Sequence, residues 1–211
     1  MNIESNSIFK LKRKELKKAI NIAVDAFMDY PVPGSFIIDK TRRKIVLYEM
    51  FKIIFKMAYR NSHIYTLGGD FKEVSLWSDT IEIPKDSAYI RYISLSTIRL
   101  MFNANGRELK NLMRAFSEIE NVKKKLVLPP NTAELMVLAV SPSCQKQGRA
   151  KAMINPILDK LSLDGISCLV ITNTEVNRDI YQKMGFQLIE QYYDNRCDIN
   201  TFFLLKNPEN K

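Results

Sequence analysis

One stretch of the sequence, from Gln145 to Lys151, combines the side chains and the backbone freedom that an anion-binding loop needs. It reads QKQGRAK and lies between an apolar run and a helical pattern. Where a strand ends and a helix begins, the unpaired N–H groups of the first turn and the helix dipole point at a bound anion. Gly148 and the small Ala150 allow close approach to the backbone. Positive charge comes from Lys146, Arg149 and Lys151. The segment predicts a pyrophosphate site, and the alternative is an ordinary strand-to-helix turn.

A second stretch with chemical potential runs from Asn177 to Phe186 and reads NRDIYQKMGF. It directly follows SCLVIT, an apolar run typical of a buried strand. It contributes an amide at Asn177 and a phenol at Tyr181. The simplest alternative for Tyr181 is an amphipathic helix residue that packs on Phe186.

Periodicity and breakers predict the elements that position these stretches. The helix over 41–60 should bury Ile45, the helix over 106–123 should bury Met113, and the nearly all-apolar strand over 132–140 should be covered on both faces. The full expected order is strand 7–11, helix 14–28, loop 30–34, helix 41–60, a hairpin of strands 63–67 and 73–77 turning at 68–70, helices 87–102 and 106–123, strand 132–140, helix 148–163, strand 167–172, helix 176–184, and strands 186–193 and 197–205.

Together the two stretches resemble the motifs of the GNAT superfamily of N-acetyltransferases. The superfamily pattern (Q/R)xxGx(G/A) is matched by Gln145, Gly148 and Ala150, and NxxxxxYxxxGF, or its shorter form NxxxY, is matched from Asn177 to Phe186. The resemblance implies an α/β GNAT fold: a mixed central sheet with splayed central strands, flanked by helices, with a helical insertion at about 86–125. It implies a single N-acetyltransferase domain over 1–211, with an acceptor-side half at about 1–130 and an acetyl-CoA-binding half at about 131–211.

The run LAVSPSCQKQGRAKAMINPILDKL, with Pro156 inside the helix, is similar to the branch that includes puromycin N-acetyltransferase. Two positions depart from that branch. Met136 stands where relatives often carry a glutamate on the central strand, and Ile171 stands where they also often show glutamate. These departures leave aminonucleosides unsupported as the acceptor.

The resemblance also implies roles for individual residues. Acetyl-CoA would be the co-substrate, with its pyrophosphate at Gln145, Lys146, Gln147, Gly148, Arg149, Ala150 and Lys151, and its pantetheine arm paired with the backbone of Leu138, Ala139 and Val140. Asn177 would hydrogen-bond to the pantetheine. Tyr181 would give a proton to the departing thiolate, a general-acid role that a phenol with an ordinary pKa near 10 can fill when it is well positioned.

The expected reaction is direct attack of a neutral amine on the acetyl carbonyl, with the oxyanion bound by the backbone N–H of Val140. No covalent acetyl-enzyme is needed, and Cys144, just before the loop, has no paired histidine. Glu134 precedes Met136 by two residues, on the same face if the strand alternates regularly. It is either a displaced base acting through a water or a strand-end carboxylate.

Composition excludes several other classes. The chain has 211 residues, 46% hydrophobic, with three dispersed cysteines and a single histidine, His63. These features argue against disulfide frameworks, metal sites and triad hydrolases, so we expect no metal. No apolar run is long enough to span a membrane and no signal peptide precedes the domain, which predicts a cytoplasmic protein without membrane contact.

The net charge of +9 is concentrated at Lys10–Lys18 and Lys123–Lys125. It indicates either an anionic partner or solvated helix faces. The basic runs carry no interleaved aromatics, so nucleic acid is not the expected partner. The leading hypothesis is an N-acetyltransferase for a primary amine of a small molecule. The alternative is a non-catalytic acyl-CoA-binding regulatory module. A homodimer is compatible with either function.

Overall fold

The computed structural model describes residues 8–60, 64–68, 70–78, 98–100, 102 and 105–209. Helices and strands alternate along the chain, with η marking short 3-10 turns. The elements are β1 (Ile8–Lys10), η1 (Arg13–Glu15), α1 (Leu16–Phe27), α2 (Pro31–Phe36), α3 (Lys40–Arg60), β2 (Ile64–Leu67), β3 (Glu73–Ser78), α5 (Gly106–Lys123), β4 (Thr132–Val140), η2 (Pro142–Cys144), α6 (Arg149–Leu163), β5 (Ser167–Thr172), α7 (Glu175–Lys183), β6 (Gln187–Asp194) and β7 (Ile199–Lys206).

Seven strands form one mixed sheet in the order β1-β2-β3-β4-β5-β7-β6. Among the strands in the described residues, only β4 and β5 are parallel neighbours. They pair from Thr132 to Leu135 on β4, although β4 continues to Val140, while β5 continues along β7 as far as Thr172. The central strands therefore part halfway along β4, which confirms the predicted splayed mixed sheet.

A bulge marks the place where β4 leaves β5. The register against β3 steps from Leu76↔Val137 to Trp77↔Leu135, so Met136 is an extra residue on β4. An extra residue reverses the alternation of side chains beyond it. Leu135 accordingly packs in the cluster that contains α6 residues, whereas Val137 packs in the cluster that contains α1 residues.

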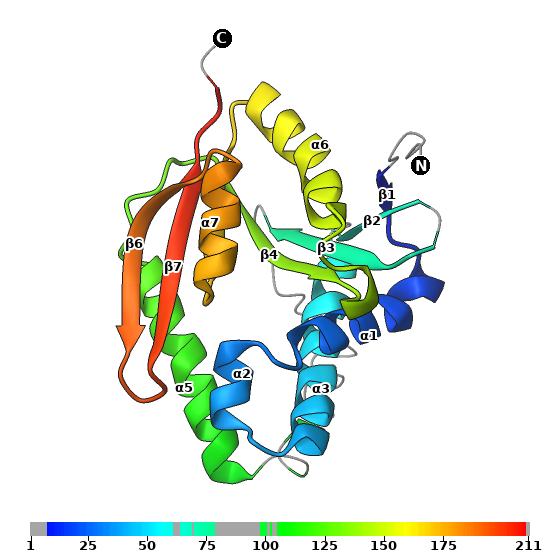
Figure 1. Ribbon diagram of the computed structural model, residues 1–211, viewed down its shortest axis with the longest axis vertical. Coiled ribbons are helices and arrows are strands. Elements are labelled where there is room, and N and C mark those ends of the chain that lie inside the picture. Colours follow the sequence, from blue (N-terminus) through cyan, green and yellow to red (C-terminus); the bar gives the residue numbers. More distant parts are fainter. Residues whose placement is uncertain are drawn as a thin grey trace.

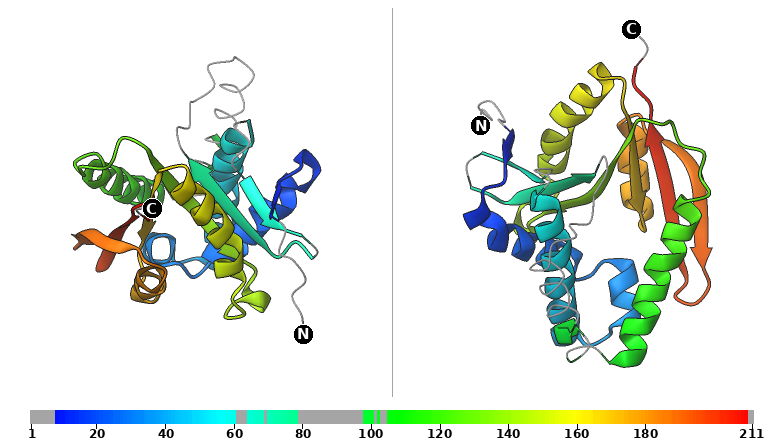
Figure 2. Two further views of the ribbon diagram at one scale, coloured as in Figure 1. Left: turned by 90° about the horizontal axis from the view of Figure 1, so that it is seen from above. Right: turned by 180° about the vertical axis from the view of Figure 1, so that it is seen from behind.

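The helices bury three apolar clusters. α1 and α3 pack on β2, β3 and the end of β4, around Phe55 and Val137. α6 and α7 pack on β5 and β7, around Met153 and Tyr181, and α2, α3 and α5 enclose Leu112. Figure 1 shows β6, β7 and α5 along one side of the molecule and β1 to β3 on the other, with β4 and α7 between them. Figure 2 shows the same arrangement from above and from behind.

The predicted loop at 30–34 is wrong, because most of it belongs to the short helix α2. Pro31 is its first residue, where a proline is favoured because its missing N–H would be unpaired anyway and its fixed φ suits the helix. Gly34 N–H donates to the Tyr30 carbonyl at 3.0 Å, which closes the first turn. Two prolines and a glycine thus form a tight helical turn rather than irregular chain.

Three burial predictions also need correction. Ile45 is exposed and Val46 and Leu47 are buried instead, although Phe51, Phe55 and Ala58 further along α3 are buried as the periodicity predicts. Met113 is exposed because α5 faces the core with Leu112 and Ala115. β4 is not covered on both faces, since Met136, at the bulge, is 38% exposed.

Some predictions fall outside the described residues. His63, Gly69 and most of the helix predicted at 87–102 belong to this group, as does most of the segment 77–86. None of the described helices combines the length and the apolar character that a membrane crossing requires.

Candidate active site

The loop between β4 and α6 is where the sequence predicts an anion site. Lys146 and Gly148 both have positive φ, 60° and 75°, and Gly148 is the N-cap of α6. A side chain at Gly148 would meet nothing within 4 Å, so the space above the loop is open. The Gln145 amide nitrogen donates to the Val140 carbonyl at 3.2 Å and ties the loop to the strand. The N–H groups of the first turn of α6 are left for a ligand.

The cations around the loop divide into two kinds. Lys146 and Lys151 are exposed, so their ammonium groups can reach an anion above the loop. Arg149 instead turns back onto the β2–β3 hairpin, where its Nε donates to Glu73 Oε2 and its Nη2 to Asp70 Oδ1, each at 2.5 Å. Hydrogen bonding to the fully buried Glu73 raises the pKa of Arg149. The Arg149 side chain anchors α6, and its contribution at the loop is its backbone N–H.

The far end of β4 presents backbone groups to the opening. Ser141 N–H donates to the Lys72 carbonyl at 2.7 Å, and hydrogen-bonded pairs alternate with non-hydrogen-bonded pairs along an antiparallel ladder. The N–H and C=O of Val140, and by the same alternation those of Leu138, therefore point away from β3. β5 has already left this part of β4. The backbone groups of Ala139 bond to β3, and the Val140 carbonyl accepts from Gln145, so the groups left to pair with an inserted chain are those of Leu138 and the N–H of Val140.

α7 brings Asn177 and Tyr181 to the same opening. Thr174 caps the helix by accepting from the Asn177 N–H at 3.2 Å. Tyr181 is buried, and its ring meets Phe186 edge-on with centroids 5.5 Å apart. Burial raises the pKa of Tyr181, and the nearby Tyr30 and Cys168 raise it further. The packing alternative and the phenol chemistry are thus compatible, because the ring packs while the hydroxyl keeps its proton.

Tyr30 belongs to this group of residues, and sequence reasoning missed it. Its hydroxyl lies 2.9 Å from Thr172 Oγ1 and accepts from the Asn173 N–H, also at 2.9 Å. The Asn177 side chain is directed at the same hydroxyl. Burial raises the pKa of Tyr30 as well. An aromatic residue directly before a double-proline turn was the available signal, but nothing in the sequence connects it to the end of β5.

Glu134 lies away from the opening, in the part of β4 that still pairs with both neighbours. Its Oε2 accepts from Lys123 Nζ at 3.0 Å. Burial by itself would lower the pKa of Lys123, but the charges and hydrogen bonds of Glu134 and Glu120 together outweigh burial and leave that pKa raised. The bulge at Met136 also breaks the regular alternation that would put Glu134 and Met136 on one face. Glu134 is an ion-paired carboxylate at the start of the strand.

The three thiols differ in their expected reactivity. Burial raises the pKa of Cys168 to about 12 and that of Cys197 to about 11, so both remain thiols near neutral pH. Cys144 is half-buried at the end of η2. We expect a disulfide reagent at pH 8 to modify Cys144 first, the half-buried Cys197 more slowly, and the buried Cys168 only after unfolding. Cys144→Ser should abolish the fast phase, and a fast phase that survives in this variant would contradict the assignment.

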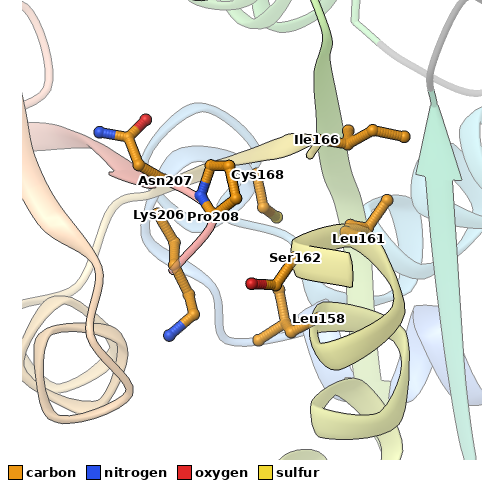
Figure 3. A pocket seen from close by; sticks show the side chains of 8 residues that line it. All are labelled: Leu158, Leu161, Ser162, Ile166, Cys168, Lys206, Asn207 and Pro208. Carbon is orange, nitrogen blue, oxygen red and sulfur yellow. The ribbon is translucent and has the colours of Figure 1, made fainter. Parts of the chain in front are cut away.

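A separate, shallow surface hollow lies at the opposite end of α6 from Gly148. Figure 3 shows the side chains that line this hollow, which come from the end of α6, the start of β5 and the end of β7. It is lined mostly by apolar side chains. Neither the predicted loop nor α7 reaches it, so it is no part of the candidate site.

Comparisons with known proteins agree with this geometry. Residues 126–197 match the family model described as an acetyltransferase (GNAT) domain, a span that includes β4, the loop, α6 and α7. A protein of Schizosaccharomyces pombe named as an uncharacterized N-acetyltransferase is 26% identical over 208 residues, which cover 95% of this chain and 83% of that protein.

Solved structures share the fold over nearly the whole chain. A histone acetyltransferase and related acetyltransferase from Corynebacterium glutamicum has a TM-score of 0.68 at 15% identity, with 98% of each chain covered. An N-acetyltransferase from Thermoplasma acidophilum in complex with coenzyme A has a TM-score of 0.55 at 15% identity, with 96% of this chain and 99% of that chain covered. Residues 126–197 thus match a GNAT acetyltransferase domain, and the similarities together support an N-acetyltransferase.

Proposed function

We propose that the protein moves an acetyl group from acetyl-CoA to the primary amine of a small molecule, by direct attack within a ternary complex. The observation that carries this proposal is the opening between β4 and β5. It connects a loop suited to pyrophosphate, a free backbone edge at Leu138 and Val140, and the hydroxyl of Tyr181. These three features lie in the order in which the pyrophosphate, the pantetheine and the thioester follow one another along acetyl-CoA.

Donor binding rests on backbone groups more than on charge. The first-turn N–H groups of α6 would hold the pyrophosphate, with Lys146 and Lys151 as exposed cations beside it. Gln145 and Gln147 keep the loop in shape, and Ala150 keeps the helix start small. The pantetheine arm would pair with Leu138 and Val140 as an additional strand and would accept a hydrogen bond from Asn177.

The chemical step needs two contributions from the protein. The amine nitrogen bonds to the acetyl carbon, and the Val140 N–H, which points into the opening, donates to the developing oxyanion. As the carbon–sulfur bond breaks, Tyr181 gives its proton to the departing thiolate. The products are an N-acetylated amine and CoA. The amine nitrogen loses a proton, and this proton restores the neutral hydroxyl of Tyr181.

Tyr30 supports the acceptor side of this proposal. Its hydroxyl, Thr172 and Asn173 form a neutral, hydrogen-bonded wall beside Tyr181. A neutral wall suits an amine that has to enter or become deprotonated before attack. Membership of the puromycin N-acetyltransferase-like branch, a single domain over 1–211, a cytoplasmic location, a homodimer and the absence of a metal remain predictions.

Glu134 gives a prediction about the proton acceptor. Because its carboxylate is paired with Lys123 and lies before the strands part, we propose a structural role for it. Glu134→Gln should lower kcat by less than about tenfold, well short of the 10²–10⁴-fold typical of a lost general base. Lys123→Met should have a similar effect. A hundredfold loss in Glu134→Gln alone, together with loss of the acid limb of the pH profile, would instead identify Glu134 as the base.

The proposed function is tested by incubating the protein with acetyl-CoA and a panel of amines and following CoA release with a thiol reagent. The panel is tyramine, spermidine, puromycin and a peptide with a free α-amine. We expect release with at least one small amine and little with the peptide. Mass spectrometry should find the acetyl group on nitrogen, and Cys144→Ser should turn over like the wild type. A peptide preference would overturn the small-molecule assignment.

A further inference from the structure

A buried arginine on α3, Arg43, donates hydrogen bonds to backbone carbonyls on both sides of Tyr30. Arg43 is 7% exposed. Its Nε donates to the Ile37 carbonyl and its Nη1 to the Met28 carbonyl, each at 2.7 Å. Its Nη2 lies 3.4 Å from the Gly34 carbonyl and 3.3 Å from that of Ile38. The guanidinium thus meets four carbonyl oxygens of one short segment.

Buried cations usually pair closely with a carboxylate, and among the described residues Arg43 does not. The carboxylate beside Arg43 is Asp29, whose oxygen is 3.7 Å away and whose side chain is 79% exposed. The carbonyls instead belong to helix ends. Met28 is the C-cap of α1 and Ile37 is the C-cap of α2, where carbonyls lack partners within the helix and the dipole favours positive charge.

The position of Tyr30 follows from these contacts. Tyr30 lies between the two helix ends whose carbonyls bond to Arg43. Hydrogen bonds from α3 therefore hold its backbone, while its hydroxyl contacts Thr172 and Asn173. A lysine has three donors on a point charge and no planar fork, so it cannot reproduce the spread of contacts that Arg43 makes. Arg43 is therefore placed to set where the phenol of Tyr30 stands relative to β5.

We propose that Arg43 is a positioning residue that fixes segment 28–38 and, through it, the acceptor side of the acetyl-transfer site. The part that concerns turnover rests on the proposed function. Arg43 does not itself contact the reacting atoms. It acts by holding Tyr30, and the donor side, from Leu138 to Lys151, is formed by other elements.

The test compares Arg43→Lys and Arg43→Ala with Arg42→Lys and Arg42→Ala. Arg42 is the matched control because its side chain is 45% exposed and pairs with Glu108 on α5 rather than with the carbonyls of segment 28–38. Hydrogen exchange followed by mass spectrometry reports on the amides of 28–38. Fluorine NMR of protein labelled with 3-fluorotyrosine, with Tyr30→Phe to assign the signal, reports on the titration of Tyr30.

Arg43→Lys should speed amide exchange in 28–38 and bring the titration of Tyr30 closer to that of an exposed tyrosine. With the most active of the amines tested for turnover, kcat/KM for the amine should fall by up to about 100-fold, as expected when a group is misplaced by about 1 Å. KM for acetyl-CoA should change little. Millimolar guanidinium should restore part of the loss in Arg43→Ala and none in Arg42→Ala.

Other outcomes overturn the proposal. One is an Arg43→Lys variant that exchanges and titrates like the wild type. Another is a variant in which KM for the amine and KM for acetyl-CoA both rise while Tm falls. That result would mean that Arg43 contributes to stability in general. If the wild type transfers no acetyl group to any amine, the proposed function fails. The exchange and fluorine measurements still decide whether Arg43 positions Tyr30.

Discussion

Tyr181→Phe is expected to lower kcat by about 10²–10⁴-fold, the range for loss of a positioned general acid. The substitution removes one oxygen and keeps the ring, so the edge-on packing against Phe186 and the fold should persist. Within the described part of the chain, the Tyr181 hydroxyl donates to no other group, so its removal leaves no protein acceptor unpaired. Acetyl-CoA affinity should therefore change little, and the loss should appear in kcat.

The measurement is steady-state turnover with acetyl-CoA and an amine substrate, with acetyl-CoA affinity determined separately by calorimetry. Tyr193→Phe is the matched control, because Tyr193 is exposed on β6 and its hydroxyl donates to Asp198. Burial raises the pKa of Tyr181, so the acid form persists as the pH rises through neutrality and Tyr181 should contribute no alkaline loss there. Wild-type kcat in Tyr181→Phe would exclude the general-acid role.

Gly148→Glu is expected to abolish acetyl-CoA binding. The new side chain would enter the open space above the loop and put negative charge where the pyrophosphate is expected. In the wild type, acetyl-CoA at about 100 times its Kd should stabilise the fold by roughly 2.7 kcal/mol. For a chain of this length that corresponds to a rise in Tm of about 5–11 °C. The variant should show no rise.

Gly165→Glu provides a closely matched control for this experiment. Gly165 also has a positive φ, 70°, and lies just beyond the other end of α6, where a side chain would likewise meet nothing within 4 Å. Both variants should carry similar backbone strain and a similar drop in unliganded Tm. Only Gly148→Glu should lose the rise with acetyl-CoA. A preserved rise in that variant would remove the loop from the binding site.

The elements around the donor side could be predicted because their signals are local. α5 was predicted with its observed ends, β4 was bounded by Thr132 and Val140, and the loop's glycine stands where a positive φ is needed. The bulge at Met136 could not be predicted, because it depends on how β3 pairs with β4 rather than on either strand alone. Period-two patterns carry no mark of an extra residue within an all-apolar run.

The acceptor side was harder because its contacts join distant parts of the chain. Tyr30 meets Thr172 over 142 positions, and Arg43 meets backbone carbonyls, which every residue possesses. Arg149 illustrates the same limit on the donor side. Its place in the loop predicted a phosphate contact, but two carboxylates on the neighbouring hairpin take its guanidinium. A sequence shows which charges exist, and the fold decides which of them are already engaged.

The short pairing between β4 and β5 has a mechanical consequence. In the part of the chain that the structure describes, the two halves of the sheet are joined by the short ladder from Thr132 to Leu135 and by the adjoining bond from the Ser167 N–H to the Asn131 carbonyl. A parallel ladder is slightly weaker per residue than an antiparallel one. A force applied across the sheet would meet its least resistance there. A pantetheine arm paired with Leu138 and Val140 would add hydrogen bonds beyond that stretch and strengthen the connection between the two halves. In a single-molecule pulling experiment, acetyl-CoA should therefore raise the rupture force between the halves, so the substrate would serve as a structural member of the sheet while it is bound.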